Sequence, residues 1–411
     1  MTHPKKPRYD RVISANSRTV RNINRAVIFN CIRERQPISR AAIAALVRLN
    51  KSTVSSIVAS LMNEDLIVED RRKSRIAVRS SVGRNPINLG LKKGRNLVGA
   101  ISFDSSTTRL AVVDIDGSIV HTDEIKTDIH PTEAFVSRCV ERLMSNRTQR
   151  HHPHLKGIGV SVAGIVDSTQ AKVVFAPNLG WEDMDVGEIL KRQCPDAGIV
   201  AIENDAKAAA LAELWFGQHD INLANFVFLS VGRGIGTGIV IDKRILTGES
   251  NIAGEFGHMV LIEGGEPCAC GNLGCWEAYA SDRATVRRYA VAKSMKPEAA
   301  CSETIDRIIA AAKGGDAIAL EELKKTGRYL GMGIANIIKA VDPDAIIVGG
   351  HIRTAWDLIE PDLLEMVRKR AFFGKSGGTV ILPTSLAVRP SLLGAAAMVQ
   401  RRLISDVRVV Q

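Results

Sequence analysis

Two segments of the chain repeat one arrangement of strands and turns, and this repetition restricts the possible folds. The first segment, residues 96–120, has apolar strands on either side of a turn rich in Ser and Thr. The second, residues 225–246, has similar strands on either side of a glycine-rich turn. A fold that uses such a hairpin twice has two similar lobes, and polar groups converge on a ligand in the cleft between them. We therefore predict an α/β body made of two related lobes.

The length and composition indicate a globular protein of more than one domain. A chain of 411 residues is too long for one ordinary core and suits two or three domains. Its apolar fraction of 45% and charged fraction of 24% are ordinary for a globular protein. The basic start has no apolar run behind it, and no run of about 18 apolar residues occurs anywhere. These features predict a cytoplasmic protein that does not enter a membrane.

Positive charge is concentrated at the front of the chain. Residues 1–95 hold 21 Lys and Arg against 6 Asp and Glu, a net +15, while the remainder carries −4. A compact basic segment on a mildly acidic body is typical of a module that binds phosphates. A solvated tail with no partner is the alternative that composition alone leaves open.

Within this basic region, the spacing of apolar residues predicts three helices. The first carries apolar residues from Val20 to Ile32 at helical spacing and ends before Pro37. Its predicted apolar face is Val20, Ile23, Val27, Ile28, Cys31 and Ile32. Ser39 can cap a second helix that runs to about Val47, with Ile43 and Leu46 turned inward.

The third helix has the features of a DNA-reading helix. Its apolar face is Val54, Ile57, Val58 and Leu61, at the i, i+3, i+4, i+7 spacing. Its opposite face carries Lys51, Ser52, Thr53, Ser55 and Ser56. Short hydroxyl side chains let the backbone approach a major groove, while the helix N-terminus and Lys51 meet phosphates.

A basic hairpin after the third helix predicts a wing. Residues 66–68 form a predicted strand, and residues 87–89 return along it. The cations expected to contact DNA between them are Arg71, Arg72, Lys73, Arg75 and Arg84. Three helices, two strands and a basic loop in this order predict a winged helix-turn-helix. A three-helix unit that binds proteins is the alternative, although it needs no such concentration of cations on one hairpin.

A cluster of cysteines predicts a structural zinc site. Cys268, Cys270 and Cys275 fall within eight residues, and His258 lies ten residues upstream of the first. In a chain without an export signal, such a cluster indicates metal binding rather than disulfides. Three thiolates and one imidazole fill the four positions of a tetrahedral zinc ion and leave no open one. Three ordinary buried cysteines are the alternative. We expect the scattered Cys31, Cys139, Cys194 and Cys301 to be plain core or half-buried residues.

The chain resembles the ROK family (repressors, open reading frames and kinases). The motifs that carry the resemblance are residues 203–206 (ENDA), 254–258 (GEFGH) and 268–277 (CACGNLGCWE). The winged helix in front of them, followed by Gly83-Arg84-Asn85-Pro86, resembles the regulators of the family rather than the free-standing kinases. The resemblance implies a two-lobed actin-like ATPase (sugar-kinase-like) body behind the winged helix-turn-helix.

The resemblance also implies domain limits and a sugar site. It places the DNA-binding domain at 1–92 and the sugar-sensing domain at 93–411. In the latter, lobe one spans about 93–203 plus a C-terminal helix at about 391–402, and lobe two spans about 204–390. The residues expected to bind sugar hydroxyls are Asn204, Asp205, Glu255, His258 and Glu277, with Asn178 as a weaker candidate. His258 would use its second ring nitrogen for the sugar. In family kinases the position of Asp205 is the general base, but here we expect it to serve binding alone.

The nucleotide loops separate a sensor from a kinase. Family kinases begin this domain with Asp-x-Gly-Gly-Thr, whose glycines let the backbone close on ATP phosphates. This chain has residues 102–107 (SFDSST) there, and either alignment loses both glycines. The second loop, residues 232–238, keeps most of its glycines, and Gly349-Gly350 resembles the adenosine-side turn of the kinases. We therefore predict no enzymatic activity, with an ATP-dependent sugar kinase as the alternative.

The resemblance implies a repressor of carbohydrate catabolic or transport genes that a sugar releases from DNA. Its expected partners are operator DNA and a small sugar or sugar derivative. One winged helix reads few base pairs, so we expect a homodimer or a dimer of dimers on palindromic half-sites.

Overall fold

The computed structural model describes residues 17–70, 87–128, 132–149, 154–221, 223–296, 303–370, 378–386 and 389–404. Contacts divide the chain into two compact units. The first comprises Met1–Asn96 with Gln400–Gln411, and the second comprises Leu97–Val399. No helix in the described ranges is both long enough and apolar enough to cross a membrane.

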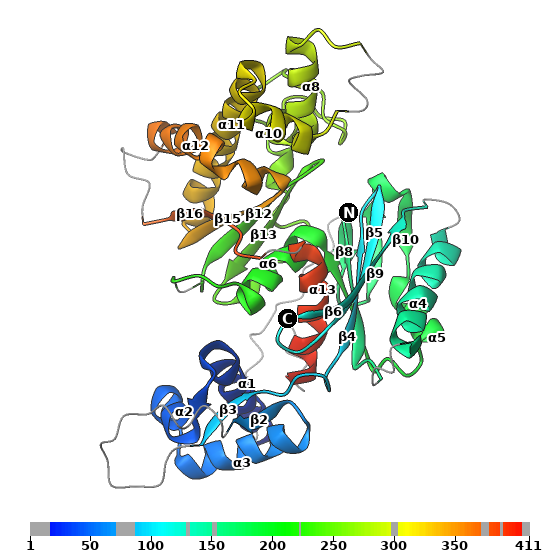
Figure 1. Cartoon of the computed structure of the whole chain (residues 1–411), viewed down its shortest axis with the longest axis vertical. Helices are drawn as coiled ribbons and strands as arrows, with labels where there is room; N and C mark the ends of the chain where they lie inside the picture. The colour runs from blue at the N-terminus through cyan, green and yellow to red at the C-terminus, as the bar shows by residue number, and fades with distance from the viewer. Residues whose placement is uncertain are drawn as a thin grey trace, which may run out of the picture. The chain divides into compact units, whose positions relative to one another are not determined.

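The first unit has three helices and a small antiparallel sheet (Figure 1). Its helices are α1 (Ser17–Arg35), α2 (Arg40–Val47) and α3 (Lys51–Asn63). Its strands, in the order β1-β3-β2, are β1 (Ile38–Ser39), β3 (Asn88–Leu91) and β2 (Ile67–Asp70). The hydroxyl of Ser39 accepts a hydrogen bond from the Ala42 amide, so the predicted cap of α2 is confirmed. Strand β1 was not predicted, because two residues are too few to show a period.

The buried faces of these helices agree only partly with the prediction. The four apolar residues predicted for α3 are all buried, but in α1 the buried residues are Ile28, Phe29 and Ile32. Val20, Ile23 and Val27, on the predicted apolar face, are 43–53% exposed. Helix α1 has 19 residues, whereas α2 has 8 and α3 has 13, so α1 is longer than either helix that packs against it. Leu46 is 51% exposed and Ala44 is buried instead.

The second unit contains two five-stranded sheets with the same topology. In each sheet three consecutive strands pair antiparallel. A later strand pairs in parallel with the first of the three, and another later strand pairs in parallel with that one. Lobe one has the order β11 (Ile199–Asn204), β7 (Gly157–Val162), β4 (Val98–Phe103), β5 (Thr107–Val113) and β6 (Ile119–Lys126). Lobe two has the order β16 (Val380–Pro383), β15 (Ala345–Gly350), β12 (Phe226–Val231), β13 (Ile235–Ile241) and β14 (Arg244–Ile245). The predicted repetition of one hairpin is confirmed.

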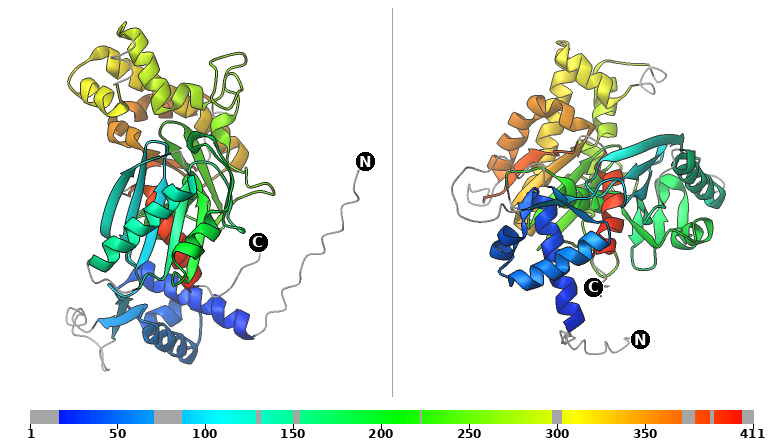
Figure 2. Two further views of the ribbon diagram at one scale, coloured as in Figure 1. Left: turned by 90° about the vertical axis from the view of Figure 1, so that its right-hand side faces the viewer. Right: turned by 60° about the horizontal axis from the view of Figure 1, so that its bottom comes forward.

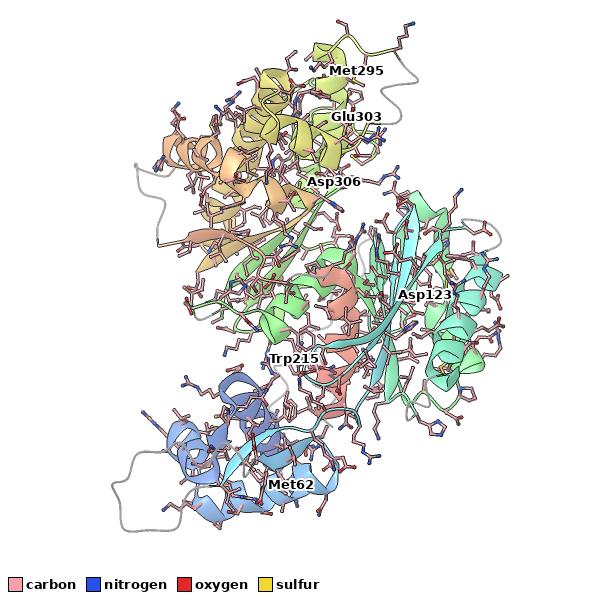
Figure 3. All side chains as sticks on the ribbon, in the orientation of Figure 1. Met62, Asp123, Trp215, Met295, Glu303 and Asp306 are labelled. Atoms are coloured by element: carbon pink, nitrogen blue, oxygen red, sulfur yellow. The ribbon has the colours of Figure 1, made fainter. Side chains whose placement is uncertain are left out.

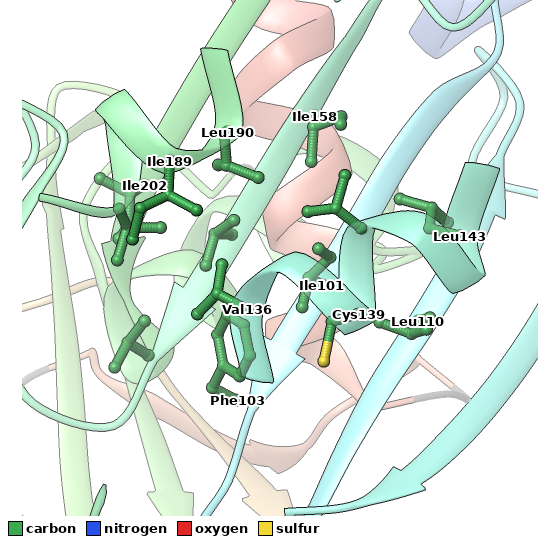
Figure 4. Packing of buried hydrophobic residues seen from close by; sticks show 14 of the residues in the cluster. Ile101, Phe103, Leu110, Val136, Cys139, Leu143, Ile158, Ile189, Leu190 and Ile202 are labelled. Atoms are coloured by element: carbon green, nitrogen blue, oxygen red, sulfur yellow. The ribbon is translucent and has the colours of Figure 1, made fainter. Parts of the chain in front are cut away.

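Helices cover both faces of the lobe-one sheet. On one face, α4 (Thr132–Gln149) and α5 (Val186–Gln193) bury side chains such as Cys139 and Leu190 against the strands (Figure 4). On the other face, α13 (Pro390–Ile404) packs Leu393 and Ala395 against the strands. The contact with α13 is close, because a Cβ added to Gly159 would lie 1.8 Å from the carbonyl oxygen of Ala395.

Several helices of lobe two pack on one face of its sheet (Figure 2). They are α7 (Glu277–Ala280), α8 (Asp282–Ala292), α10 (Ile305–Lys313), α11 (Ala317–Val341) and α12 (Trp356–Arg370). A small antiparallel sheet is attached to lobe one and consists of β8 (Ile165–Asp167), β9 (Lys172–Ala176) and β10 (Trp181–Met184).

Helix α6 (Asp205–Phe216) contacts the sheets of both lobes. Ala209 and Ala210 pack in the core of lobe two, whereas Ala212 and Phe216 pack in that of lobe one. Its run of small alanines allows both sheets to approach. The first residue of this helix therefore lies at the junction of the two lobes.

Candidate functional site

One imidazole and three thiols of lobe two converge on one point. The ligand atoms of His258, Cys268, Cys270 and Cys275 all lie within 4.8 Å of one another. His258 Nδ1 lies 3.7 Å from Cys268 Sγ, and Cys270 Sγ lies 3.7 Å from Cys275 Sγ. A tetrahedral zinc ion with bonds of about 2.0–2.3 Å separates its ligand atoms by roughly 3.5–3.8 Å. Two of the ligand-atom separations have this value and the others are at most 4.8 Å, so the four side chains are compatible with such an ion.

The loop between these cysteines turns at two glycines. Gly271 has φ +92° and Gly274 has φ +78°, which residues with a Cβ rarely adopt. A Cβ on Gly274 would also lie 1.7 Å from the carbonyl oxygen of Ile262. The amide of Cys268 donates to the carbonyl of Asn272, which closes the loop. These two glycines therefore allow the tight turn between the cysteines.

Carboxylates from three segments influence one another at the start of α6. Burial first, and then the negative charges of Asp104 and Glu255, raise the pKa of Asp205 to about 7. Asp104 belongs to the turn between β4 and β5, so it comes from lobe one. Its carboxylate also forms an ion pair with Arg389 at 3.1 Å. Asp205 and Glu255, both predicted sugar ligands, are therefore close enough to interact electrostatically.

The predicted sugar ligands Asn204 and Asn178 differ in the hydrogen bonds that their side chains make. Asn204 Oδ1 accepts hydrogen bonds from the amides of Ala206 and Lys207, and its Nδ2 donates to the carbonyl of Gly164 at 3.0 Å. Its side chain therefore caps α6, and one N–H remains for a ligand. Asn178 is exposed in the short turn η2 (Pro177–Leu179), and within the described ranges its side chain has no hydrogen-bond partner.

Glu277 connects the cysteine loop to the glycine-rich loop. Its Oε2 accepts a hydrogen bond of 2.9 Å from the amide of Ile235, and its Oε1 lies 3.8 Å from Cys268 Sγ. The carboxylate therefore takes up the hydrogen bond of one backbone amide in the glycine-rich loop. In the family kinases the glycines of this loop would face phosphates. His258 and Glu277 approach the same cysteine from different segments.

The turn between β4 and β5 carries a carboxylate instead of glycines. Asp104 Oδ1 accepts a hydrogen bond from the hydroxyl of Ser105, and its main-chain carbonyl accepts one from Thr127. These bonds fix a negative charge in the turn. Like charges oppose each other at close range, so this carboxylate disfavours a polyphosphate in the turn, although the ion pair with Arg389 offsets part of its charge.

Lys207 is a site residue that the sequence analysis missed. It is 2% exposed, and its ammonium donates to the carbonyl of Asn251 at 2.7 Å, on the segment that leads to Glu255. Burial lowers its pKa, while the charges of Glu203 and Glu255 act in the opposite direction. Its place beside Asp205 in the motif was the available signal, but a lysine one turn into a helix is usually solvent-exposed.

The predicted DNA-reading face of α3 is exposed. Lys51, Ser52, Ser55 and Ser56 are exposed and Thr53 is half-buried. The side chain of Asn50 makes no capping hydrogen bond, so it leaves the first-turn amides of α3 without that partner. The predicted wing cations Arg71, Arg72, Lys73, Arg75 and Arg84 lie outside the described residues. Of the other cysteines, Cys139 and Cys194 are buried and Cys31 is half-buried, as predicted, while Cys301 is not described.

Comparison with known proteins identifies the family. The ROK family model matches residues 98–402. The chain belongs to the ROK family. It is 31% identical to the xylose repressor of Bacillus subtilis (strain 168), over 94% of this chain and 97% of that protein. It is 32% identical to the glucokinase of Streptomyces coelicolor over 72% of this chain and 96% of that protein. The match to the glucokinase thus leaves more than a quarter of this chain uncovered.

A solved structure supports the same assignment. The ROK-family transcriptional regulator described as a homologue of the Escherichia coli MLC protein aligns with a TM-score of 0.77 and 25% identity. The alignment covers 94% of this chain and 97% of that chain. The predicted fold, a winged helix-turn-helix joined to a two-lobed actin-like ATPase body, is confirmed.

Proposed function

We propose that the chain is a DNA-binding transcriptional repressor of carbohydrate catabolic or transport genes, which a sugar releases from its operator. The observation that carries the proposal is the exposed polar face of α3 in a winged unit joined to a ROK body. Regulators of similar length match both parts of the chain, whereas the glucokinase matches 72% of it. Operator DNA binds through Lys51, Ser52, Thr53, Ser55 and Ser56, and through the wing cations Arg71, Arg72, Lys73, Arg75 and Arg84.

The sugar binds where α6 begins, between the lobes. Asp205 and Glu255 accept hydrogen bonds from its hydroxyls, as does the oxygen of Glu277 that Ile235 leaves free. His258 holds a structural zinc ion through Nδ1 together with the three cysteines, and its Nε2 faces the sugar. Asn204 contributes its remaining N–H and Asn178 a contact from lobe one. The zinc supplies a cross-link that orients His258 and the cysteine loop.

The chain does not transfer phosphate in this proposal. The carboxylate of Asp104 lies in the turn where the family kinases have glycines that close on ATP phosphates. Glu277 accepts the hydrogen bond of a backbone amide in the second, glycine-rich loop. A dimer of the ROK body presents two winged units to palindromic half-sites.

The test uses the full-length protein and DNA selected from a random-sequence library. We expect selective binding of a palindromic site, measured by fluorescence anisotropy, and release of that DNA by one or more monosaccharides. A phosphotransfer assay with magnesium-ATP and the same sugars should give no product. Failure to select any DNA sequence, or turnover of a sugar with ATP, contradicts the proposal.

A further inference from the structure

A hollow of about 510 Å³ lies beside Glu277 on lobe two. One wall is the face of α8 that carries Arg283 and Arg287, and another is the cysteine loop at Cys268. Arg233, from the glycine-rich loop, and Met295, labelled in Figure 3 and placed just after α8, also line it. We call this hollow the arginine groove. Its volume lies in the range of small-molecule sites, which is about 300–1,000 Å³.

Two of its three arginines have no partner among the residues that the structure describes. Arg233 and Arg283 are exposed, and among the residues that the structure describes neither side chain has a hydrogen bond or an ion pair. Arg287 forms an ion pair with Glu266 at 3.2 Å and donates to the carbonyl of Ala278 at 3.1 Å. A guanidinium has five N–H donors, so even Arg287 can donate further.

The positions of these arginines concentrate positive charge. Arg283 and Arg287 are four residues apart on α8, where side chains are neighbours and like charges destabilise the helix. Arg233 reaches the same hollow from a separate element. Glu277 is the one acidic residue among the described residues of the lining, so these residues together carry a net positive charge. Guanidinium groups bind phosphate and carboxylate groups through paired hydrogen bonds, and a ligand with such a group would relieve the repulsion.

We propose that the arginine groove binds the acidic group, phosphate or carboxylate, of an acidic sugar whose ring lies against Glu277. This inference rests on the proposed function, because Glu277 belongs to the proposed sugar site. Glu277 lines the groove and also contacts the glycine-rich loop, so one ligand can touch Glu277 and the arginines together. The effector is then distinguished from neutral sugars by its charge, which hydroxyl-binding residues alone cannot read.

The test compares neutral and acidic ligands by isothermal titration of the full-length protein. The probes are glucose, mannose and galactose, the 6-phosphate of each, glucuronate, and inorganic phosphate. The variant is Arg233→Ala/Arg283→Ala, and the matched control is Arg244→Ala, an exposed arginine outside the groove. We expect an acidic sugar to bind at least about 10-fold tighter than its neutral counterpart, and the double variant to lose at least about 10-fold of that affinity. Arg244→Ala should bind like wild type.

Three results overturn the inference. In the first, the double variant binds acidic sugars as tightly as wild type does. In the second, no acidic ligand binds tighter than its neutral counterpart. In the third, inorganic phosphate binds as tightly as the sugar phosphates. The last result assigns the groove to free phosphate.

Operator release separates the inference from the proposed function. If a neutral sugar releases DNA from wild type and from the double variant alike, the groove assignment fails and the proposed function stands. If an acidic sugar binds through the arginines but no ligand of the panel changes DNA affinity, the sensing function fails and the groove assignment stands.

Discussion

Glu277 accepts a hydrogen bond of 2.9 Å from the main-chain amide of Ile235, and this bond places a carboxylate on the glycine-rich loop of lobe two. The other oxygen of Glu277 lies 3.8 Å from Cys268 Sγ. One side chain thus connects the cysteine cluster, the glycine-rich loop and the arginine groove. A change in any one of them can therefore affect the others through Glu277.

Loss of one thiol should release the metal. Cys270→Ser removes one of four ligands, so we expect zinc affinity to fall by more than about 100-fold and the melting temperature to decrease. Cys31→Ser is the matched control, because Cys31 is half-buried and outside the cluster. Zinc content by mass spectrometry and calorimetry test both variants. Stoichiometric zinc in purified Cys270→Ser would show that the cluster is not the metal site.

Asp205 should make the stability of the protein depend on pH. Its pKa is about 7 in the folded chain, because of burial and then the charges of Asp104 and Glu255, against about 3.9 in an unfolded chain. Between these values the folded chain holds a proton that the unfolded chain has released, so the free energy of unfolding falls as the pH rises. Asp205→Asn cannot ionise. Its melting temperature relative to wild type should therefore increase from pH 5 to pH 8.

Asp167→Asn is the control for this pH series. The hydrogen bond from Thr169 lowers the pKa of Asp167, so that carboxylate stays ionised throughout the range and the difference from wild type should not change. An Asp205→Asn difference that is equally constant between pH 5 and pH 8 contradicts the raised pKa.

A second aspartate should show the same pH dependence independently. Burial raises the pKa of Asp282 to about 7, with a further contribution from the charge of Asp306. Within the described residues its Oδ1 is buried without a hydrogen-bond partner. Asp282→Asn should therefore also gain stability relative to wild type as the pH rises from 5 to 8, measured by calorimetry. A stability gain of Asp282→Asn over wild type that is present at pH 5 and lost at pH 8 would contradict the raised pKa.

The sequence predicted some parts of this site better than others, for physical reasons. The apolar face of α3 and the cysteine cluster follow from local spacing, which the chain itself records. The exposure of Leu46 does not, because it depends on what packs against a short helix. Asp104 and Asp205 are 101 positions apart, and only the packing of α6 between two sheets brings them into electrostatic contact. The arginine groove was missed for the same reason, since Arg233 and Arg283 meet only in the folded lobe.

A single cation on α3 should contribute measurably to DNA binding. Lys51 is exposed at the first position of the helix, where it can neutralise one phosphate. Lys51→Ala should weaken binding to all DNA sequences alike and lower the slope of log affinity against log salt by about 1. Anisotropy at several salt concentrations measures this slope. Arg244→Ala, which removes an exposed cation from lobe two, should leave it unchanged, and an unchanged slope for Lys51→Ala would remove this residue from the interface.

The close contact between α13 and the lobe-one sheet should not tolerate a side chain. A Cβ at Gly159 would lie 1.8 Å from the carbonyl oxygen of Ala395, so Gly159→Ala must displace either the strand or the helix. We expect a loss of about 1–3 kcal/mol in the free energy of unfolding, measured by urea denaturation. Gly378→Ala is the matched control, because a Cβ there meets no atom within 4 Å and should leave the stability nearly unchanged. Equal stability of the two variants would mean that α13 does not pack on β7 as closely as the structure shows.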